Sequence, residues 1–188
     1  MIAEAYPTWN GNRKRFDTSL RLPHVVDAIG AYGNPQKYVL IERIPSRLSD
    51  ISILNEGQAL KVLSSTYRGL ANLEPMFGYF GVTESCICFN SEGNVKIWVN
   101  SNLSSLTPLR RFDPQFNIRN RIIEQVLQMV ERKCFNPVLF YGFKNKISEV
   151  NNFSFNAAGA YIEHLADDLF LEIKGHHKMP ERKNRKSH

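Results

Sequence analysis

A polar loop followed by a β-rich hairpin occupies residues 78–103, with the sequence GYFGVTESCICFNSEGNVKIWVNSNL. Enzymes often place acids, bases and nucleophiles on such loops. Ser85 lacks the nucleophile-elbow setting of a catalytic serine, and Cys86 and Cys88 lack the spacing of a zinc site. We therefore expect this stretch to carry no catalytic group.

The histidines offer little more chemistry. His24 follows a proline beside an expected strand, with no partnered carboxylate evident nearby, so a packing or surface role is favoured over that of a general base. His164 precedes two aspartates at helical spacing, which is typical of an exposed contact on a helix surface. His176 and His177 fall in a basic segment, where metal binding would be weak.

Composition bounds the class of protein. The chain has 188 residues, of which 43% are apolar, 11% aromatic and 22% charged, as in a single globular domain with a substantial core. It has no apolar run of the roughly 18 residues that a membrane span needs, and residues 1–16 lack the apolar core of a signal peptide. Three cysteines, an odd number, are expected to be reduced and mostly buried. We expect an intracellular protein, cytoplasmic or nuclear, without membrane contact.

The net charge of +6 is concentrated at the C-terminal end. Residues 174–188, KGHHKMPERKNRKSH, carry six Lys or Arg and one Glu, a net charge of +5. This segment has no apolar periodicity, so a disordered tail is expected, either simply solvated or in contact with nucleic acid, an acidic protein surface or an import receptor. Its candidate contacts with an anionic partner are Lys178, Arg182, Lys183, Arg185 and Lys186.

Hydrophobic periodicity then predicts the elements that would position any site. Two β-rich runs flank the turn signal GNPQK, and a second hairpin flanks NSEGN. Asn55 with Gln58 resembles a capping box at the start of an amphipathic helix, and two further apolar stripes predict helices later in the chain. The predicted order is strands 25–32 and 38–44, a short helix at 48–54, a helix from 55, a hairpin at 85–99 with Trp98 in the core, and helices around 118–130 and 156–173.

This order resembles the centre of a eukaryotic protein kinase over residues 22–103. The supporting stretches are YVLIERI, a long helix ending YRGLANLEPM, and the hairpin CICFNSEGNVKIWV, whose GNVKI is common before the metal-binding Asp-Phe-Gly triplet of kinases. The resemblance implies an α+β, protein kinase-like fold with a mostly helical C-lobe and a reduced N-terminal β portion. It places Ile41 at the gatekeeper and Glu42, Arg43 and Ile44 at the hinge between lobes.

The same resemblance removes the catalytic groups of the family. Tyr79 and Phe80 stand at the His and Arg positions, and Gly81 stands at the catalytic Asp. The remaining altered positions are Thr83 for the phosphate-contacting Lys, Cys86 for the magnesium-binding Asn and Val99 for the magnesium-binding Asp. Phosphoryl transfer depends on positioning and on metal ions, which glycine, valine and a soft thiol do not supply.

The upstream half of a kinase is also missing, since about twenty residues precede the first hairpin and no G-x-G-x-x-G occurs. We therefore expect an extension at residues 1–21, a truncated kinase-like domain at 22–173 and a basic tail at 174–188. The expected function is that of an inactive binding or scaffold module that needs no cofactor and engages a protein partner, with residues 38–44 as an exposed strand edge. The alternatives are a basic protein associated with nucleic acid, for which Arg119 and Arg121 add support, and a residual nucleotide binder that works without metal.

Overall fold

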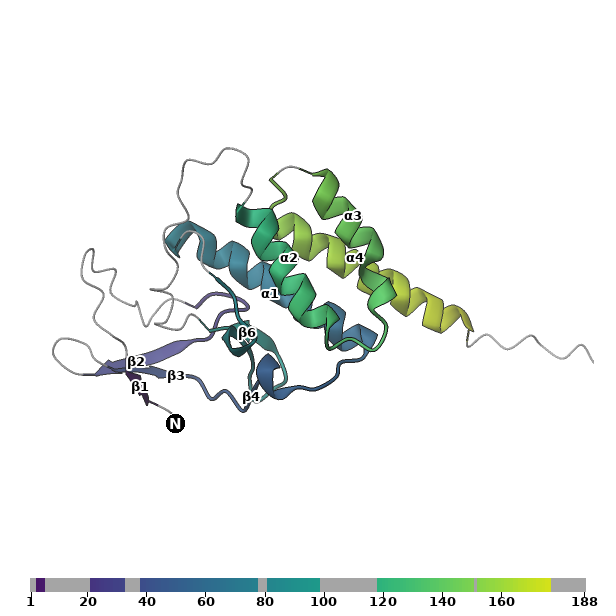
Figure 1. The fold of residues 1–188 in the computed structure, drawn as a ribbon. Coiled ribbons are helices and arrows are strands. Elements are labelled where there is room, and N and C mark those ends of the chain that lie inside the picture. The colour runs from purple at the N-terminus through teal and green to yellow at the C-terminus, as the bar shows by residue number, and fades with distance from the viewer. Residues whose placement is uncertain are drawn as a thin grey trace, which may run out of the picture.

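The computed structural model describes residues 3–5, 21–32, 38–77, 81–98, 118–150 and 152–176. Two small antiparallel sheets lie at one side and four helices pack together at the other, so the fold is α+β (Figure 1). The strands are β1 (Ala3–Ala5), β2 (Ala28–Tyr32), β3 (Tyr38–Ile41), β4 (Ser46–Arg47), β5 (Ile87–Phe89) and β6 (Val95–Ile97). The helices are η1 (Leu48–Asp50), α1 (Glu56–Phe77), η2 (Glu84–Cys86), α2 (Ile118–Glu131), η4 (Pro137–Phe140), α3 (Tyr141–Glu149) and α4 (Phe155–His176).

The first sheet has the order β1-β3-β2, so β3 is its central strand. Ala3 lies opposite Leu40 on one side of β3, and Tyr32 lies opposite Tyr38 on the other. The expectation of an exposed edge at residues 38–44 is therefore wrong for β3, because residues near the N-terminus fold back and pair with it. A partner strand has no free edge to join there.

The second sheet has the order β4-β5-β6, and its hairpin was predicted correctly. The turn between β5 and β6 is fixed by Asn90, whose side-chain oxygen accepts hydrogen bonds from the backbone N–H groups of Glu92 and Asn94. Gly93 has a φ of 75°, a left-handed conformation that glycine adopts without strain. Local turn chemistry therefore sets the register of this hairpin.

Helix α1 begins at the predicted capping box. The Asn55 side chain accepts a hydrogen bond from the Gln58 backbone N–H at 2.8 Å, and the Gln58 side chain accepts one from the Asn55 N–H at 3.0 Å. The short helix expected at 48–54 covers only residues 48–50. At the other end of the chain, α4 continues to His176, so the first three residues of the expected tail are helical. The rest of that tail, from residue 177, lies outside the described residues.

The main core lies between α1 and the helices that follow it. Leu63, Tyr67 and Leu70 of α1 are at most 1% exposed, and α4 runs antiparallel along the same helix. The buried hydroxyl of Tyr67 donates a hydrogen bond to the backbone oxygen of Ile123 in α2 at 3.0 Å. Burial raises the pKa of this phenol well above its ordinary value, so the group acts as a neutral donor. None of the helices in the described part of the chain is long and apolar enough to cross a membrane.

Candidate functional site

The hinge-like residues lie where the two sheets meet. Ile41, the gatekeeper-like residue at the end of β3, is buried in a small apolar cluster that is separate from the main core. Cys88 of β5 and Trp98, just after β6, fill the same cluster, and Trp98 is only 3% exposed. The apolar surface that leads into residues 42–44 is thus covered by side chains of the second hairpin. The remaining members of the cluster are Val26 and Ala28, with Ile44 packed against it and partly buried.

A charged cluster borders this apolar junction. The Lys96 Nζ lies 2.5 Å from Glu42 Oε1 and 3.1 Å from Asp27 Oδ2. The backbone N–H of Asp27 donates to the same Glu42 oxygen at 2.8 Å, and the Glu42 N–H donates to the Asp27 backbone oxygen at 2.9 Å. The three side chains are 17–25% exposed, so their charges are only partly screened by water. We call these three residues the Lys96 cluster.

The protonation of Lys96 follows from these contacts. Burial acts to lower the pKa of Lys96, but the hydrogen bonds with Glu42 and Asp27 act to raise it and outweigh burial, so its pKa lies above the ordinary value. Lys96 therefore remains a cation through the physiological range. It holds together two carboxylates that come from the two strands of the first hairpin and fixes them to the second hairpin.

A third set of contacts fixes the junction to α1. The backbone oxygen of His24 accepts a hydrogen bond from the Ile97 N–H at 2.8 Å, and the Asn72 side chain of α1 donates to the backbone oxygen of Pro23 at 2.8 Å. His24 has a φ of 60°, which is uncommon for a residue other than glycine. Its oxygen comes so close to Gly69 that a Cβ there would lie only 2.6 Å away. The backbone of His24 thus joins β6 to α1.

The loop before β5, which the kinase resemblance would place at the catalytic loop, is held by several contacts. Gln125 of α2 donates to the backbone oxygen of Val82 at 3.1 Å, and Lys133 forms an ion pair of 3.0 Å with Glu84. The Cys86 backbone oxygen accepts from the Trp98 N–H at 2.7 Å. Contacts with the second hairpin and with the α2 region therefore position this loop.

The positions that the kinase resemblance marks as altered bring few reactive groups together in the described part of the chain. Gly81 is half-buried and has no side chain, Thr83 is exposed, and the buried Cys86 has its Sγ 3.2 Å from the Thr83 Oγ1. Tyr79, Phe80 and Val99 lie outside the described residues. Cys86, Cys88 and Cys134 are all buried free thiols, as expected. Among the residues described here, no three His, Cys, Asp or Glu side chains are grouped as ligands for a metal ion.

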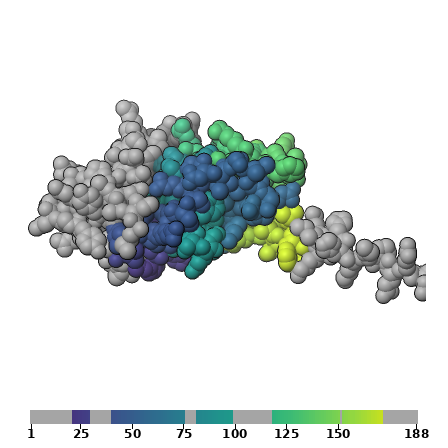
Figure 2. Space-filling model, turned by 90° about the horizontal axis from the view of Figure 1, so that it is seen from below, coloured from purple at the N-terminus to yellow at the C-terminus, as the bar shows by residue number. Residues whose placement is uncertain are grey.

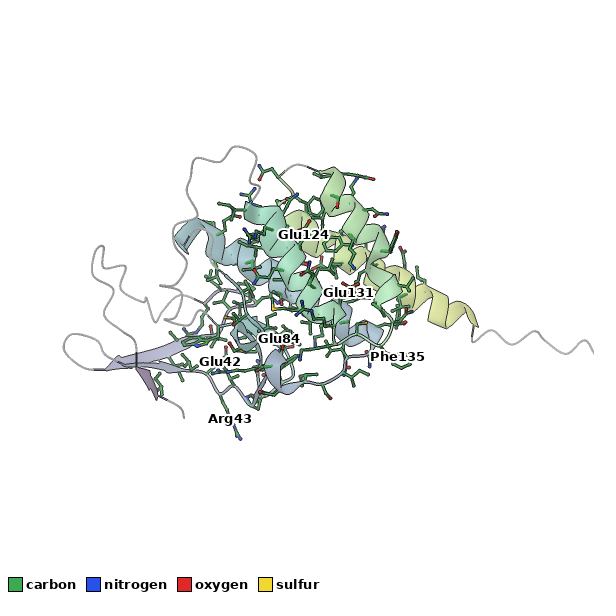
Figure 3. The ribbon with its side chains drawn as sticks, in the orientation of Figure 1. Glu42, Arg43, Glu84, Glu124, Glu131 and Phe135 are labelled. Atoms are coloured by element: carbon green, nitrogen blue, oxygen red, sulfur yellow. The ribbon has the colours of Figure 1, made fainter. Side chains whose placement is uncertain are left out.

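The four hinge-like residues have different surroundings. Ile41 is buried, Ile44 is partly buried, and Glu42 is engaged through both its carboxylate and its backbone N–H. Arg43 is exposed and points away from the body of the molecule, as Figure 3 shows. Of these residues, Arg43 offers its side chain to solvent, whereas Ile41 and Glu42 are used inside the fold.

The sequence interpretation missed the Lys96 cluster, although a signal was present. Because Ala28 lies opposite Ile41 in the hairpin, Asp27 and Glu42 follow as the next opposed pair. Two acids directly opposite each other are destabilising unless a cation lies between them. The pair therefore predicts a nearby Lys or Arg, but only when the register of the hairpin is known.

A second missed feature lies away from the junction. Phe135, Val138 and Tyr141 are 69–79% exposed, and the labels of Figure 3 place Phe135 far from Glu42. The sequence of this segment, FNPVLFY, is dense in apolar residues but was assigned to no element. Exposed aromatic side chains that cluster at a surface are typical of an interface.

Comparison with protein-family models and with curated proteins finds no match to this chain.

Proposed function

We propose that the chain is a catalytically inactive, kinase-like module that binds a protein partner. One observation carries the proposal: the residues aligned with a kinase hinge and with its catalytic loop serve to join parts of this protein. Glu42 is bound to Lys96, Ile41 is covered by Trp98, and Cys86 is buried beside Thr83. The carboxylate of Glu42 is paired with Lys96, and the isoleucine and thiol side chains supply neither a base nor a hard metal ligand at these positions.

The kinase-like part of the proposal is supported by the order of the elements. A hairpin leads through residues 42–44 to a long helix, then to a short loop and a second hairpin whose turn contains Gly93. This is the order on which the resemblance depends. The binding part is supported by the exposed apolar segment at 135–141, because large exposed apolar side chains mark interaction surfaces.

Phosphoryl transfer to the chain itself and to generic substrates tests the catalytic half. We expect none in the presence of ATP and magnesium, with an active kinase assayed in parallel. Gly81→Asp should remain inactive, because one base without metal ligands leaves the developing phosphate charge unshielded. A magnesium-dependent transfer that copurifies with the folded chain would overturn the proposal.

Nucleotide binding without catalysis is tested separately by a thermal shift with ATP, with and without magnesium. A ligand at 100 times its Kd would stabilise the fold by about 2.7 kcal/mol. We expect no shift, because Trp98 and Cys88 cover Ile41, and the Glu42 N–H already donates to Asp27. A clear ATP-dependent rise would favour the residual nucleotide binder instead.

Association with nucleic acid is the second candidate, and the net charge of +6 favours it. Arg119, however, is engaged within the fold, where its guanidinium lies 2.5 Å from Glu74 and 2.7 Å from the Asn152 side chain. The basic residues 178–186 would then have to carry the binding. Retention on nucleic acid that falls steeply with salt, and is lost when residues 178–188 are deleted, would support this function.

The proposed setting is inside the cell, in the cytoplasm or nucleus. The three free, buried cysteines fit a reducing compartment, and the basic run after residue 177 fits a nuclear import signal. Imaging of the full chain and of a chain without residues 178–188 tests the import role. If only the shorter chain loses its nuclear signal, the basic run is the import signal.

A further inference from the structure

Exposed apolar side chains are concentrated in three segments of the chain. The described residues include seven large hydrophobic side chains that are strongly exposed, and six of them lie at positions 53, 135–141 and 170–171. The seventh is Ile29 of β2. We call the six the apolar surface: Ile53, Phe135, Val138, Tyr141, Phe170 and Leu171.

Backbone and side-chain contacts bring these segments together. The Leu54 N–H donates to the Lys133 backbone oxygen at 2.7 Å, and the Leu54 oxygen accepts from the Phe135 N–H at 3.0 Å. The Asn136 side chain donates to Glu56, at the start of α1, at 2.7 Å. Figure 2 shows that the blue atoms around α1, the green atoms of the α2–α3 region and the yellow atoms of α4 adjoin. The apolar surface is therefore shared by packed segments that are far apart in the sequence.

The exposed apolar area is large for a surface without an occupant. Phe135, Tyr141 and Phe170 are 79%, 69% and 57% exposed. At roughly 200 Å² for each aromatic side chain, these three alone expose about 400 Å². The largest apolar patch of a typical monomer is about 300–600 Å² and is often functional, and the three aliphatic members extend this one further.

A groove lies beside Phe170, between the start of α1 and the C-terminal half of α4. It has a volume of about 390 Å³, and Leu60, Ala166 and Leu169 form its apolar part. The groove between two antiparallel helices is a place where a third helix can pack its apolar side chains. An amphipathic helix presents such side chains at i, i+4 and i+7, over a length of about 10 Å. The shape of the groove therefore fits a helical partner.

The rim of this groove is acidic. Asp167 and Asp168 are exposed on α4, in the same turn as the groove residues of that helix. Glu56 lines the groove from α1 and accepts a hydrogen bond from the neutral amide of Asn136, a contact that leaves its negative charge in place. None of the ion pairs between described residues involves any of these three carboxylates. The three therefore give the groove a negative rim.

The cations that flank the apolar surface in the sequence do not cancel this charge. Lys133 forms an ion pair with Glu84, and Lys144 forms one with Glu131, so both lysines are neutralised within the fold. Arg132, exposed just after α2, offsets one of the three negative charges at most. The groove therefore keeps a net negative charge.

The sign of this charge discriminates between classes of partner. Nucleic acid and the cytoplasmic face of a membrane are both anionic, and a rim of carboxylates repels them. A protein segment that carries Lys or Arg beside its apolar side chains is attracted instead, and the alkyl stems of those residues add to the apolar contact. A basic amphipathic helix thus matches both the shape and the charge of the groove.

We propose that the apolar surface and its groove bind an amphipathic helix of a partner protein. Large aliphatic side chains of that helix fill the groove, and its Lys or Arg residues lie beside Glu56, Asp167 and Asp168. The inference rests on the binding half of the proposed function and names the chemistry of the partner. It does not depend on the kinase-like relationship.

The test uses two synthetic peptides of about 18 residues, a length at which a helix forms in water. Both carry leucine at i, i+3, i+4 and i+7 along one face, and they differ only in the flanking residues, which are Lys in one peptide and Glu in the other. Fluorescence anisotropy measures the affinity of each peptide for the full chain. At low salt the Lys peptide should bind with a Kd below about 100 µM and at least about fivefold more tightly than the Glu peptide. The difference should shrink as salt is raised.

Three variants locate the binding site. Phe135→Ser with Leu171→Ser should weaken binding of the Lys peptide at least about 10-fold, as expected when two apolar anchors of an interface are removed. Asp167→Asn with Asp168→Asn should bring the affinities of the two peptides closer together. Ile29→Ser, which changes the exposed hydrophobic residue outside the apolar surface, should leave both affinities unchanged. Circular dichroism and melting temperature establish that each variant is folded.

Three results with the peptides would overturn the proposal. They are equal affinities of the two peptides at low salt, no binding of either peptide up to about 1 mM, and a loss with Ile29→Ser as large as that with the double serine variant. Phosphoryl transfer by the chain would overturn its proposed inactivity without changing these results, so the two failures are distinguishable.

Two other occupants of the surface would also overturn the proposal, and each has its own signature. If the Lys peptide binds only after residues 178–188 are deleted, the occupant is the chain's own C-terminal run. If sedimentation equilibrium shows a dimer of the wild type that Phe135→Ser with Leu171→Ser dissociates, the occupant is a second copy.

Discussion

Replacing Lys96 with methionine should destabilise the protein by about 2–3 kcal/mol. The substitution keeps the length and apolar stem of the side chain but leaves Glu42 and Asp27 close together without the cation between them. Exposed ion pairs contribute at most about 1 kcal/mol, and breaking a buried pair costs about 3–5 kcal/mol. The side chains of the Lys96 cluster are 17–25% exposed, and Arg21, 3.7 Å from Asp27, offers partial compensation, so an intermediate value is expected.

Urea unfolding followed by circular dichroism and tryptophan emission measures this effect. For a chain of this length the loss corresponds to a fall in Tm of about 5–10 °C. Lys61→Met is the matched control, because Lys61 is exposed and its Nζ contacts only a backbone oxygen, that of Gly93 at 3.3 Å, among the bonds described here. The control should change stability by less than about 0.5 kcal/mol.

A double-mutant cycle with Glu42→Gln identifies the cause of the loss. The two substitutions should be less destabilising together than the sum of their separate effects, because they remove one shared interaction. The difference in unfolding free energy between wild type and Lys96→Met should also shrink above about pH 10.4. The pKa of Lys96 is raised in the folded state, so its charge contributes stability below the unfolded pKa, and this contribution is lost as the pH rises through the folded pKa. Additive effects, or a loss below about 0.5 kcal/mol, would refute the reasoning.

Two further substitutions test other parts of the fold. Gly69→Ala should lower the unfolding free energy by about 1–3 kcal/mol despite the better helix propensity of alanine, because the new Cβ would meet the His24 backbone oxygen at 2.6 Å. The control Gly57→Ala, whose new Cβ would have its nearest contact 3.7 Å away, should not destabilise the protein. Equal melting temperatures for the two variants would contradict this argument. Glu163→Gln should reduce the loss of stability that the protein shows between about pH 5 and pH 3. The hydrogen bond from Arg68 lowers the pKa of Glu163, and the stability contributed by this carboxylate disappears as the pH falls through the lowered pKa. Curves of Tm against pH that run parallel for variant and wild type would count against this prediction.

Elements with strong local signals could be predicted from the sequence. The capping box at Asn55 marked the start of α1 to within one residue, and the turn sequence NSEGN marked the second hairpin. These features depend on contacts between residues two to four positions apart, which a sequence pattern records directly. The burial of Trp98 also followed from its place beside an apolar strand.

Elements that depend on distant contacts could not be predicted in the same way. Strand β1 has three residues and pairs with a strand 33–37 positions later, so no local pattern identifies it. The expectation of an exposed edge failed for this reason. The position of the exposed apolar segment at 135–141 likewise depends on Leu54 pairing with residues 133–135.

Helix α3 and the preceding η4 were missed although a pattern exists. Phe140, Phe143 and Ile147 are buried and recur at helical spacing. Pro137 and Gly142 look like turn residues in the sequence, but proline is well tolerated in the first turn of a helix, and Pro137 begins η4. For the candidate site, the hinge-like and loop positions rested on a resemblance alone, whereas the Lys96 cluster became visible only with the register of the first hairpin.

The packing of α4 against α1 has a consequence for synthesis of the chain. Arg68 and Glu163, which join the two helices, are 95 positions apart. At roughly 5–20 residues per second, the ribosome finishes α1 about 5–20 s before α4 can reach it. Helix α2 emerges earlier and covers part of α1, but the side that faces α4 stays open to water or to a chaperone during that interval. Nascent chains that end between residues 80 and 155 should therefore be the form of this protein most prone to aggregate.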